Sequence, residues 1–504
     1  MDIITVWLQN MALGAHAVFN FWTFFLLFLG VTFGIIVGAM PGLSPSLGVA
    51  LMLPLTFGLD PMNALIILVA VYLAANYGGS ITAIIINTPG TAGSFASTFD
   101  GYELTRQGKP GLALGASIYA ATVGGVIGGI FLMLFSGPVA KMALACGSFE
   151  YFALAVFGLS IISSLSNNKP LHGLVAVAFG LLVMTIGVDS QLSLNRFTFG
   201  LSSLEEGIPL IPALIGLFAL GQIFHDIEKN DLIGLVMKQY SAKLLTWKQI
   251  WSLRKVTFIS SLIGTTIGAI PGAGSAIASI IAYSQAKRVS KTPEDFGKGS
   301  LEGVAAPEAA NCSSVGGALI PLLTLGIPGS ASCAVMLGAL MMHKITPGPE
   351  LFKPAASGGH PELVYGIFIS LFLANIIMFI LGLLGNRLWV RIINVPRAVV
   401  YSIIIVMSFI GSYFVSNSFS DVWICFVFGI ISWLFKRSDI PVAPVILAIV
   451  LGKMIEDNLR LSLVRGSWFM IFDRPVALIV LLIAVITFVW PYVKMLKAKK
   501  SQMV

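Results

Sequence analysis

Four Pro-Gly pairs interrupt apolar stretches of the chain, at residues 41–42, 89–90, 271–272 and 328–329. Proline fits the first turn of a helix but not its interior, so each pair predicts a broken helix. A helix start offers free backbone N–H groups and a partial positive charge. An anion can bind there without a basic side chain, and no Lys or Arg occurs within the apolar segments around the breaks. The chemistry expected at these positions is therefore anion binding.

Small polar residues gather around the four breaks. Ser44 and Ser275 are predicted caps just beyond two of the prolines, and Thr88 is a predicted cap before Pro89. Asn and Ser residues add neutral hydrogen-bonding groups. The alternative is that each Pro-Gly pair only kinks a packed helix. The predicted substrate-binding set is Gly42, Ser44, Asn76, Asn87, Thr88, Gly90, Thr91, Gly272, Gly274, Ser275, Asn311, Gly329, Ser330 and Ser332.

Few acids stand near the apolar segments. Glu302 and Glu308 begin the second long broken stretch, and Asp100 ends the first. An acid at membrane depth is a candidate relay for a proton or another cation. Glu308 is accordingly the candidate for ion coupling, with a loop-end carboxylate as the equal alternative. For Asp100 the favoured interpretation is a carboxylate in water at the end of a loop.

The sequence lacks the motifs of ATP-driven and hydrolytic chemistry. The run Gly297-Lys298-Gly299-Ser300 is not a P-loop, because residue 292 is Thr and no Ser or Thr follows the lysine directly. The five histidines are scattered and no GxSxG motif occurs. We therefore expect no enzyme activity, no cofactor and no metal site. The coupling ion is expected to be Na⁺ or H⁺. The four cysteines are expected to pack as small apolar residues.

The composition requires a membrane. Of the 504 residues 57% are hydrophobic and 10% are charged, whereas a soluble domain carries about 25% charged residues. A span needs about 20 apolar residues, so the chain predicts an all-α polytopic protein with about 11 to 12 transmembrane helices plus re-entrant or broken helices at the Pro-Gly pairs. The net charge of +8 is dispersed between spans, which excludes nucleic acid as a partner. Two long segments, 62–98 and 303–342, are expected to break both at Gly-Gly pairs (78–79 and 316–317) and at Pro-Gly pairs.

Three ordered matches indicate an internal duplication. Residues 34–42 match 264–272, residues 74–79 match 309–317, and residues 89–92 match 328–331, at offsets of 230, 235 and 239. Basic loops alternate between the copies, since Gly58–Met62 has no Lys or Arg while residues 284–300 have four. This alternation predicts two inverted-topology repeats. The predicted domains are 1–225, a first membrane repeat; 226–255, a cytoplasmic amphipathic linker; and 256–504, a second membrane repeat. An ordinary packed connecting helix is the alternative for the linker.

Several long motifs resemble the TctA family, the large membrane subunit of tripartite tricarboxylate transporters. They are residues 77–92 (YGGSITAIIINTPGTA), 99–102 (FDGY), 268–274 (GAIPGAG), 296–311 (FGKGSLEGVAAPEAAN) and 325–332 (LGIPGSAS), and the resemblance extends over nearly the whole chain. One departure is Cys312, where the family usually has a second Asn after Ala-Asn.

The resemblance implies a multi-pass protein of the bacterial inner membrane. It further implies import of tricarboxylates or related carboxylates by an ion-coupled secondary transporter. The implied partners are a small four-helix membrane subunit (TctB-like) and a periplasmic substrate-binding protein (TctC-like). Composition and spacing alone also allow a cation/proton antiporter or a channel, which would have more intramembrane acids, or a lipid enzyme, which would have a catalytic cluster.

Overall fold

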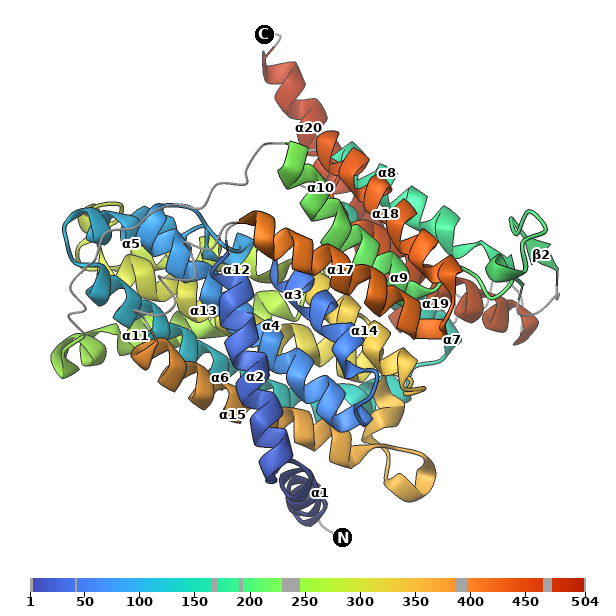
Figure 1. Cartoon of the computed structure of the whole chain (residues 1–504), viewed down its shortest axis with the longest axis horizontal. Coiled ribbons are helices and arrows are strands. Elements are labelled where there is room, and N and C mark those ends of the chain that lie inside the picture. The colour runs from blue at the N-terminus through green and yellow to red at the C-terminus, as the bar shows by residue number, and fades with distance from the viewer. Residues whose placement is uncertain are drawn as a thin grey trace.

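The computed structural model describes residues 3–40, 43–164, 170–189, 194–228, 245–385, 397–465 and 474–502, and these are mainly helical (Figure 1). Within this part the strands are the short antiparallel pair β1 (Gly187–Val188) and β2 (Asn195–Arg196). The helices of the first half are α1 (Ile3–Val18), α2 (Phe21–Gly38), α3 (Pro45–Met52), α4 (Pro61–Ile86), α5 (Ser97–Arg106), α6 (Pro110–Leu144), α7 (Ser148–Ser164), α8 (Pro170–Met184), α9 (Leu210–Ile215) and α10 (Gly221–Glu228). Those of the second half are α11 (Trp247–Gly268), α12 (Gly274–Val289), α13 (Leu301–Leu325), α14 (Ala331–Met342), α15 (Pro361–Leu384), α17 (Arg397–Ser416), α18 (Phe419–Arg437), α19 (Ala443–Arg465) and α20 (Pro475–Gln502). Short turns such as η1 (Leu53–Thr56), η2 (Ala92–Ser94) and the π-turn η4 (Gly216–Leu220) connect or interrupt them.

The apolar helices confirm an all-α polytopic membrane protein. Among the described residues, seven helices are long and apolar enough to cross a membrane, and five shorter apolar helices accompany them. The long set includes α2, α4, α6, α15, α17, α18 and the continuous run from α9 through α10. Most predicted spans agree with these bounds within a few residues, because each apolar run of the sequence becomes one helix.

Two groups of helices make up the molecule. Figure 1 places α8, α9, α10, α18 and α19 together on one side and α5, α6, α11, α12 and α13 on the other. In the second group the long helix α13 packs against both α6 and α11, and α2 packs against α4. In the first group α19 packs against α7 and α8, and α18 packs against η4 and α10.

The glycines of both halves let helices cross closely. A Cβ on Gly38 of α2 would lie 2.2 Å from the Ala75 carbonyl oxygen of α4, and one on Gly268 of α11 would lie 2.4 Å from that of Ser314 on α13. Such contacts are possible only for glycine. The same crossing therefore joins α2 to α4 in the first half and α11 to α13 in the second.

The Gly-Gly pairs belong to these crossings and do not break their helices. Both α4 and α13 run continuously through them, so the predicted breaks at 78–79 and 316–317 are wrong. Gly78 lies against the carbonyl of Ile35 on α2, and Gly317 lies against the carbonyl of Thr265 on α11. Ile35 and Thr265 are 230 residues apart, which is the offset of the matching segments on these two helices. Gly78 of α4 and Gly317 of α13 therefore occupy equivalent positions, at an offset of 239 residues. The sequence match of 74–79 with 309–317 at an offset of 235 pairs residues that are one helical turn out of register.

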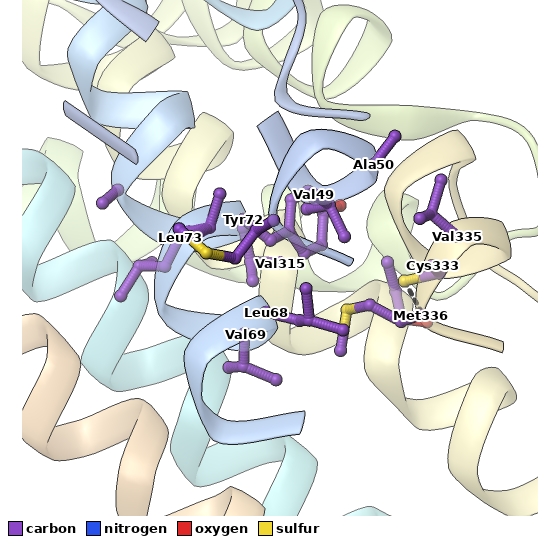
Figure 2. Packing of buried hydrophobic residues seen from close by; sticks show 14 of the residues in the cluster. Val49, Ala50, Leu68, Val69, Tyr72, Leu73, Val315, Cys333, Val335 and Met336 are labelled. Atoms are coloured by element: carbon purple, nitrogen blue, oxygen red, sulfur yellow. Dashed lines mark hydrogen bonds between the residues drawn. The ribbon is translucent and has the colours of Figure 1, made fainter. Parts of the chain in front are cut away.

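A continuous apolar core joins the two halves at α3, α4 and α14. Figure 2 shows Val49 of α3, Leu68 of α4 and Met336 of α14 in this core. Both Leu68 and Val49 are fully buried, and the thiol of Cys333 on α14 donates to the Ala318 carbonyl 3.4 Å away on α13. Residues Ser46–Met52 of α3 are all buried, which fixes the start of this short helix beside α4 and α14.

An ion network fixes the loop between α8 and α9 to α19. Arg460 donates to both oxygens of Asp189, at 3.0 and 2.8 Å, and Arg196 donates to Glu456 at 2.7 Å. Bidentate pairs of this kind orient as well as attract. The network links both ends of the β1–β2 turn to a membrane helix.

The linker predicted at 226–255 falls partly outside the described residues, since 229–244 lie outside them. Its ends belong to neighbouring helices: Asp226 to α10, and Trp247 to Lys255 to α11. α11 therefore begins within the predicted linker and continues into the predicted second repeat. The inverted orientation of the two halves stays a prediction.

Candidate functional site

Three helix N-termini meet at one cavity of about 290 Å³. These are the starts of α3, α12 and α14, each just after a Pro-Gly pair, and the middle of α4 and the start of α19 complete the walls. Among the described residues, no Lys, Arg, Asp or Glu lines it. The cavity contains seven residues of the predicted set, namely Ser44, Asn76, Gly272, Gly274, Ser275, Ser330 and Ser332.

Serine side chains cap two of these helices. The Ser44 hydroxyl accepts the Leu47 N–H at the start of α3 at 3.1 Å, as predicted, and the Ser330 hydroxyl accepts the Cys333 N–H at the start of α14 at 3.2 Å. Ser275 is not a cap, because α12 begins at Gly274 without a side-chain cap. The remaining first-turn N–H groups lack helical acceptors.

Backbone contacts fix the Pro-Gly breaks within each half of the chain. The Gly272 N–H donates to the Gly329 carbonyl at 3.0 Å, which joins the two breaks of the second half. The Gly90 N–H donates to the Gly79 carbonyl at 3.0 Å, and a Cβ on Gly90 would lie 2.1 Å from the Gly38 carbonyl oxygen. Gly90 and Gly329 are therefore packing positions beside the cavity rather than part of its lining.

The Pro-Gly break at residues 89–90 differs from its prediction in detail. α4 ends at Ile86 with Asn87 in the left-handed conformation (φ 56°). Thr88 does not cap a helix, and its hydroxyl donates to the Ile86 carbonyl at 3.3 Å. Thr91 takes the capping role instead, through contacts with Ser94 at the start of η2. Asn87 is exposed and does not line the cavity, and Gly42 lies outside the described residues.

Side chains from α4 and α13 reach across to the breaks of the opposite half. Tyr72 of α4 bonds through its hydroxyl to that of Ser330 at 2.9 Å. Asn311 of α13, which corresponds to Tyr72 at the offset of 239, lies against Gly93 just after the break at residues 89–90. A Cβ on Gly93 would lie 2.1 Å from Asn311 Oδ1. Each long helix thus positions a polar group at the break of the other half.

Two buried amide groups keep an unused acceptor near the cavity. Asn76 donates Nδ2–H to the Tyr72 carbonyl at 2.9 Å, and Asn311 donates to the Asn76 carbonyl at 3.0 Å. These bonds fix the orientation of both amides, because only the nitrogen can donate. The Oδ1 atoms of Asn76 and Asn311 are buried without a hydrogen-bond partner. An unused buried acceptor is costly, by about 1–3 kcal/mol, so both oxygens are suited to a hydrogen-bond donor or a cation.

Sequence reasoning missed Tyr72 and Ser46, and also Pro441, Ala443 and Pro444, which border the cavity too. Tyr72 stands in an aliphatic run, and a hydroxyl in such a run is the signal that could have identified it. Nothing in the sequence near Pro441–Pro444 indicates proximity to the breaks, since this contact depends on how α19 packs against α14.

Glu308 of α13 is completely buried among serines. The Ser97 hydroxyl of α5 donates to its Oε1, and the Ser117 hydroxyl of α6 donates to Oε2 at 3.1 Å. Ser80 of α4 lies beside the same carboxyl group. No ion pair to Glu308 occurs among the described residues, and the hydrogen bonds to its carboxyl group come from hydroxyl groups. Burial of a carboxyl group without a cationic partner favours the binding of a proton or another cation.

Asp100 is buried, which contradicts the solvated carboxylate expected for it. Its Oδ1 accepts the N–H groups of Gly297, Gly299 and Ser300 at 2.7–2.9 Å, and its Oδ2 accepts the Tyr283 hydroxyl at 2.8 Å. Ser300 is the N-cap of α13. The carboxylate in the first turn of α5 thus binds the loop before α13, and its role in the structure is to hold the two halves together.

Comparison with known proteins gives one family and two relatives. The family model of the tripartite tricarboxylate transporter TctA family matches residues 24–447. The chain is 34% identical over 504 residues to an uncharacterized 52.8 kDa protein in the TAR-I ttuC' 3' region of Agrobacterium vitis, covering 100% of this chain and 99% of that protein. It is also 34% identical over 241 residues to an uncharacterized protein in the TAR-II ttuC' 3' region of the same organism, covering 47% of this chain and 98% of that protein. No solved structure matches the chain.

Proposed function

The chain belongs to the tripartite tricarboxylate transporter TctA family and is a transmembrane subunit of such a transporter; we propose that it imports tricarboxylates or related carboxylates through the cavity where its broken helices meet. The proposal depends on one observation. Three helix N-termini and several serine hydroxyls surround a cavity without charged side chains. Free N–H groups at helix starts bind carboxylates, and the absence of a fixed positive charge lets the anion leave again.

We further propose that uptake is coupled to a cation at Glu308. The buried carboxyl group is surrounded by hydroxyl groups from three neighbouring helices. A proton or Na⁺ would neutralise the carboxylate, and hydroxyl oxygens can serve either cation. Because Glu308 and Asn311 share α13, occupancy of the acid can influence the position of this helix beside the breaks.

The proposed partners and location follow from family membership. A TctC-like periplasmic binding protein would deliver the carboxylate to the outer face, where residues 189–206 and 346–361 lie in the predicted topology. A TctB-like four-helix subunit would pack against apolar helix faces in the bacterial inner membrane. Exposed apolar side chains such as Phe135, Ile380 and Val485 are available for contact with lipid or with such a subunit.

Uptake of labelled di- and tricarboxylates tests the proposed function. Cells that carry the binding protein and the small subunit are compared with and without this chain, across imposed sodium and pH gradients. We expect uptake of at least one carboxylate only with the chain present, and only with an inward cation gradient. Uptake that is unchanged by deletion of the chain would contradict the proposal.

A further inference from the structure

A second cavity, remote from the breaks, lies between α11 and α12. It has a volume of about 480 Å³ and is bordered by residues 252–260 of α11 and 285–292 of α12 and the turn after it, with Glu302 at its end. Its walls are apolar at Val256, Ile259, Ala286 and Val289. The mouth carries Lys255 and Lys291 together with hydroxyl groups from Ser252, Ser290 and Thr292. An apolar groove with a basic, hydroxyl-rich mouth is thus present on one face of the molecule.

The two lysines of this groove are free to bind an anion. Both are exposed, and neither forms an ion pair with an acid of the described part of the chain. The one acid of the lining, Glu302, accepts the Ser290 hydroxyl at 2.6 Å. The lining therefore keeps a net positive charge, and the basic last turn of α12, with Lys287 and Arg288, adds to it.

Neighbouring side chains are typical of a membrane–water interface. Trp247 and Trp251 near the start of α11 are 76% and 61% exposed, and the Arg254 guanidinium lies 3.8 Å from the Trp251 ring centre. Tryptophan rings prefer the level of the lipid headgroups. About two turns beyond Trp251 on α11, Phe258 is exposed, as are Ile280 and Ile281 of α12. The mouth of the groove is therefore expected at headgroup level and its apolar walls at acyl-chain level.

We propose that this groove binds an anionic phospholipid of the cytoplasmic leaflet. Its phosphate would lie between Lys255 and Lys291 and accept hydrogen bonds from the serine and threonine hydroxyls, and one acyl chain would pack along Val256, Ile259 and Val289. Basic pockets between membrane helices on the cytoplasmic side bind such headgroups. The 271–272 break joins α11 to α12, and residues just after it line the proposed substrate cavity. The lipid would therefore lie between the two helices that support this part of the substrate cavity. This proposal does not depend on the substrate of the transporter.

Lipid retention by the purified full chain tests the proposal. The chain is delipidated in detergent and titrated with phosphatidylglycerol or phosphatidylcholine, and bound lipid is counted by native mass spectrometry. The double variant Lys255→Gln/Lys291→Gln is compared with Lys109→Gln/Lys141→Gln, which removes the same charge at exposed lysines outside the groove. Thermal unfolding of each variant verifies that all remain folded, as expected for exposed positions.

We expect the wild type and the control variant to bind phosphatidylglycerol about 10- to 30-fold more tightly than phosphatidylcholine, from two lysines near the phosphate. The groove variant should lose that preference. Equal affinity of the wild type for both lipids would overturn the proposal, as would a preference that survives in the groove variant. Displacement of phosphatidylglycerol by inorganic phosphate at similar concentration would also overturn it, because the acyl chain would then contribute nothing.

Discussion

At the scale of single residues, the account depends on polar groups placed in an apolar interior. Glu308 is surrounded by serines, Asn76 and Asn311 keep unused amide oxygens, and serines cap the helices that start at the cavity. Their common property is that a ligand can replace a missing hydrogen-bond or charge partner, which is what a reversible carrier requires.

Glu308→Gln is expected to uncouple transport. The amide keeps the shape and the hydrogen-bonding capacity of the side chain but cannot take up a proton or neutralise a cation. Gradient-driven uptake should fall by about 100-fold or more, in the range seen when one essential charged group is removed. Exchange of internal for external carboxylate should persist. Glu302→Gln, on the first turn of the same helix, should leave uptake near wild type, and wild-type gradient-driven uptake by Glu308→Gln would contradict the coupling role.

Ser330→Ala is expected to weaken carboxylate recognition. The hydroxyl caps α14, borders the cavity and contacts Tyr72. Its loss should raise the KM for uptake about tenfold, the equivalent of one hydrogen bond to a charged group. Ser418→Ala removes a comparable cap at the start of α18 and controls for the loss of helix stability. Equal effects of the two substitutions on KM would contradict the placement of the site.

At the scale of helices, sequence patterns predicted most spans and located the breaks. Apolar runs of sufficient length have few alternatives in a membrane, and Pro-Gly pairs cannot continue a helix. The Gly-Gly pairs misled because glycine in a membrane helix serves close crossing as often as bending. A Cβ on Gly78 or Gly317 would lie only 2.5 or 2.2 Å from a neighbouring backbone oxygen, and this close packing is a tertiary property that a local sequence pattern does not reveal.

Two features of the candidate site could not be predicted for the same reason. Asp100 precedes a polar turn and has the sequence context of a solvated residue, yet the loop before α13 folds over it. Tyr72 faces Ser330 because α4 and α14 pack together across 258 positions of sequence. Long-range contacts of this kind depend on how the two halves dock, whereas Ser44 could be predicted because a cap is local.

Gly268→Leu is expected to separate α11 from α13. A Cβ at this position already approaches the Ser314 carbonyl to 2.4 Å, so the larger side chain should destabilise the protein by about 1–3 kcal/mol through overpacking. Gly137→Ala on α6 meets nothing within 4 Å and should be neutral or slightly stabilising. Thermal unfolding in detergent compares the two variants, and an unchanged midpoint for Gly268→Leu would contradict the close crossing.

At the scale of the whole molecule, the two halves repeat the same helix crossing. A side chain of each half contacts the break of the other half. α2 with α4 and α11 with α13 are joined by glycine contacts in the same register. The alternation of basic loops predicts that these halves have opposite orientations in the membrane. In such an arrangement each half can adopt the conformation of the other. The cavity would then open alternately to the two sides of the membrane.

Single-cysteine labelling tests the inverted orientation. Cysteines at Asp60, before α4, and at Lys291, after α12, occupy exposed turns that follow the equivalent hairpins. In a background without Cys146, Cys312, Cys333 and Cys425 they should react with an impermeant thiol reagent from opposite sides of the membrane. Reaction of both from the same side would mean that the halves are parallel.

The most direct measurement of the central claim is reconstitution in liposomes. The purified chain is inserted with or without the small membrane subunit, the binding protein is added outside, and labelled citrate is followed under an imposed sodium or proton gradient. The account predicts negligible uptake by the chain alone and gradient-dependent accumulation when both partners are present. Full-rate transport by the single chain, or accumulation by the complete system without any cation gradient, would contradict it.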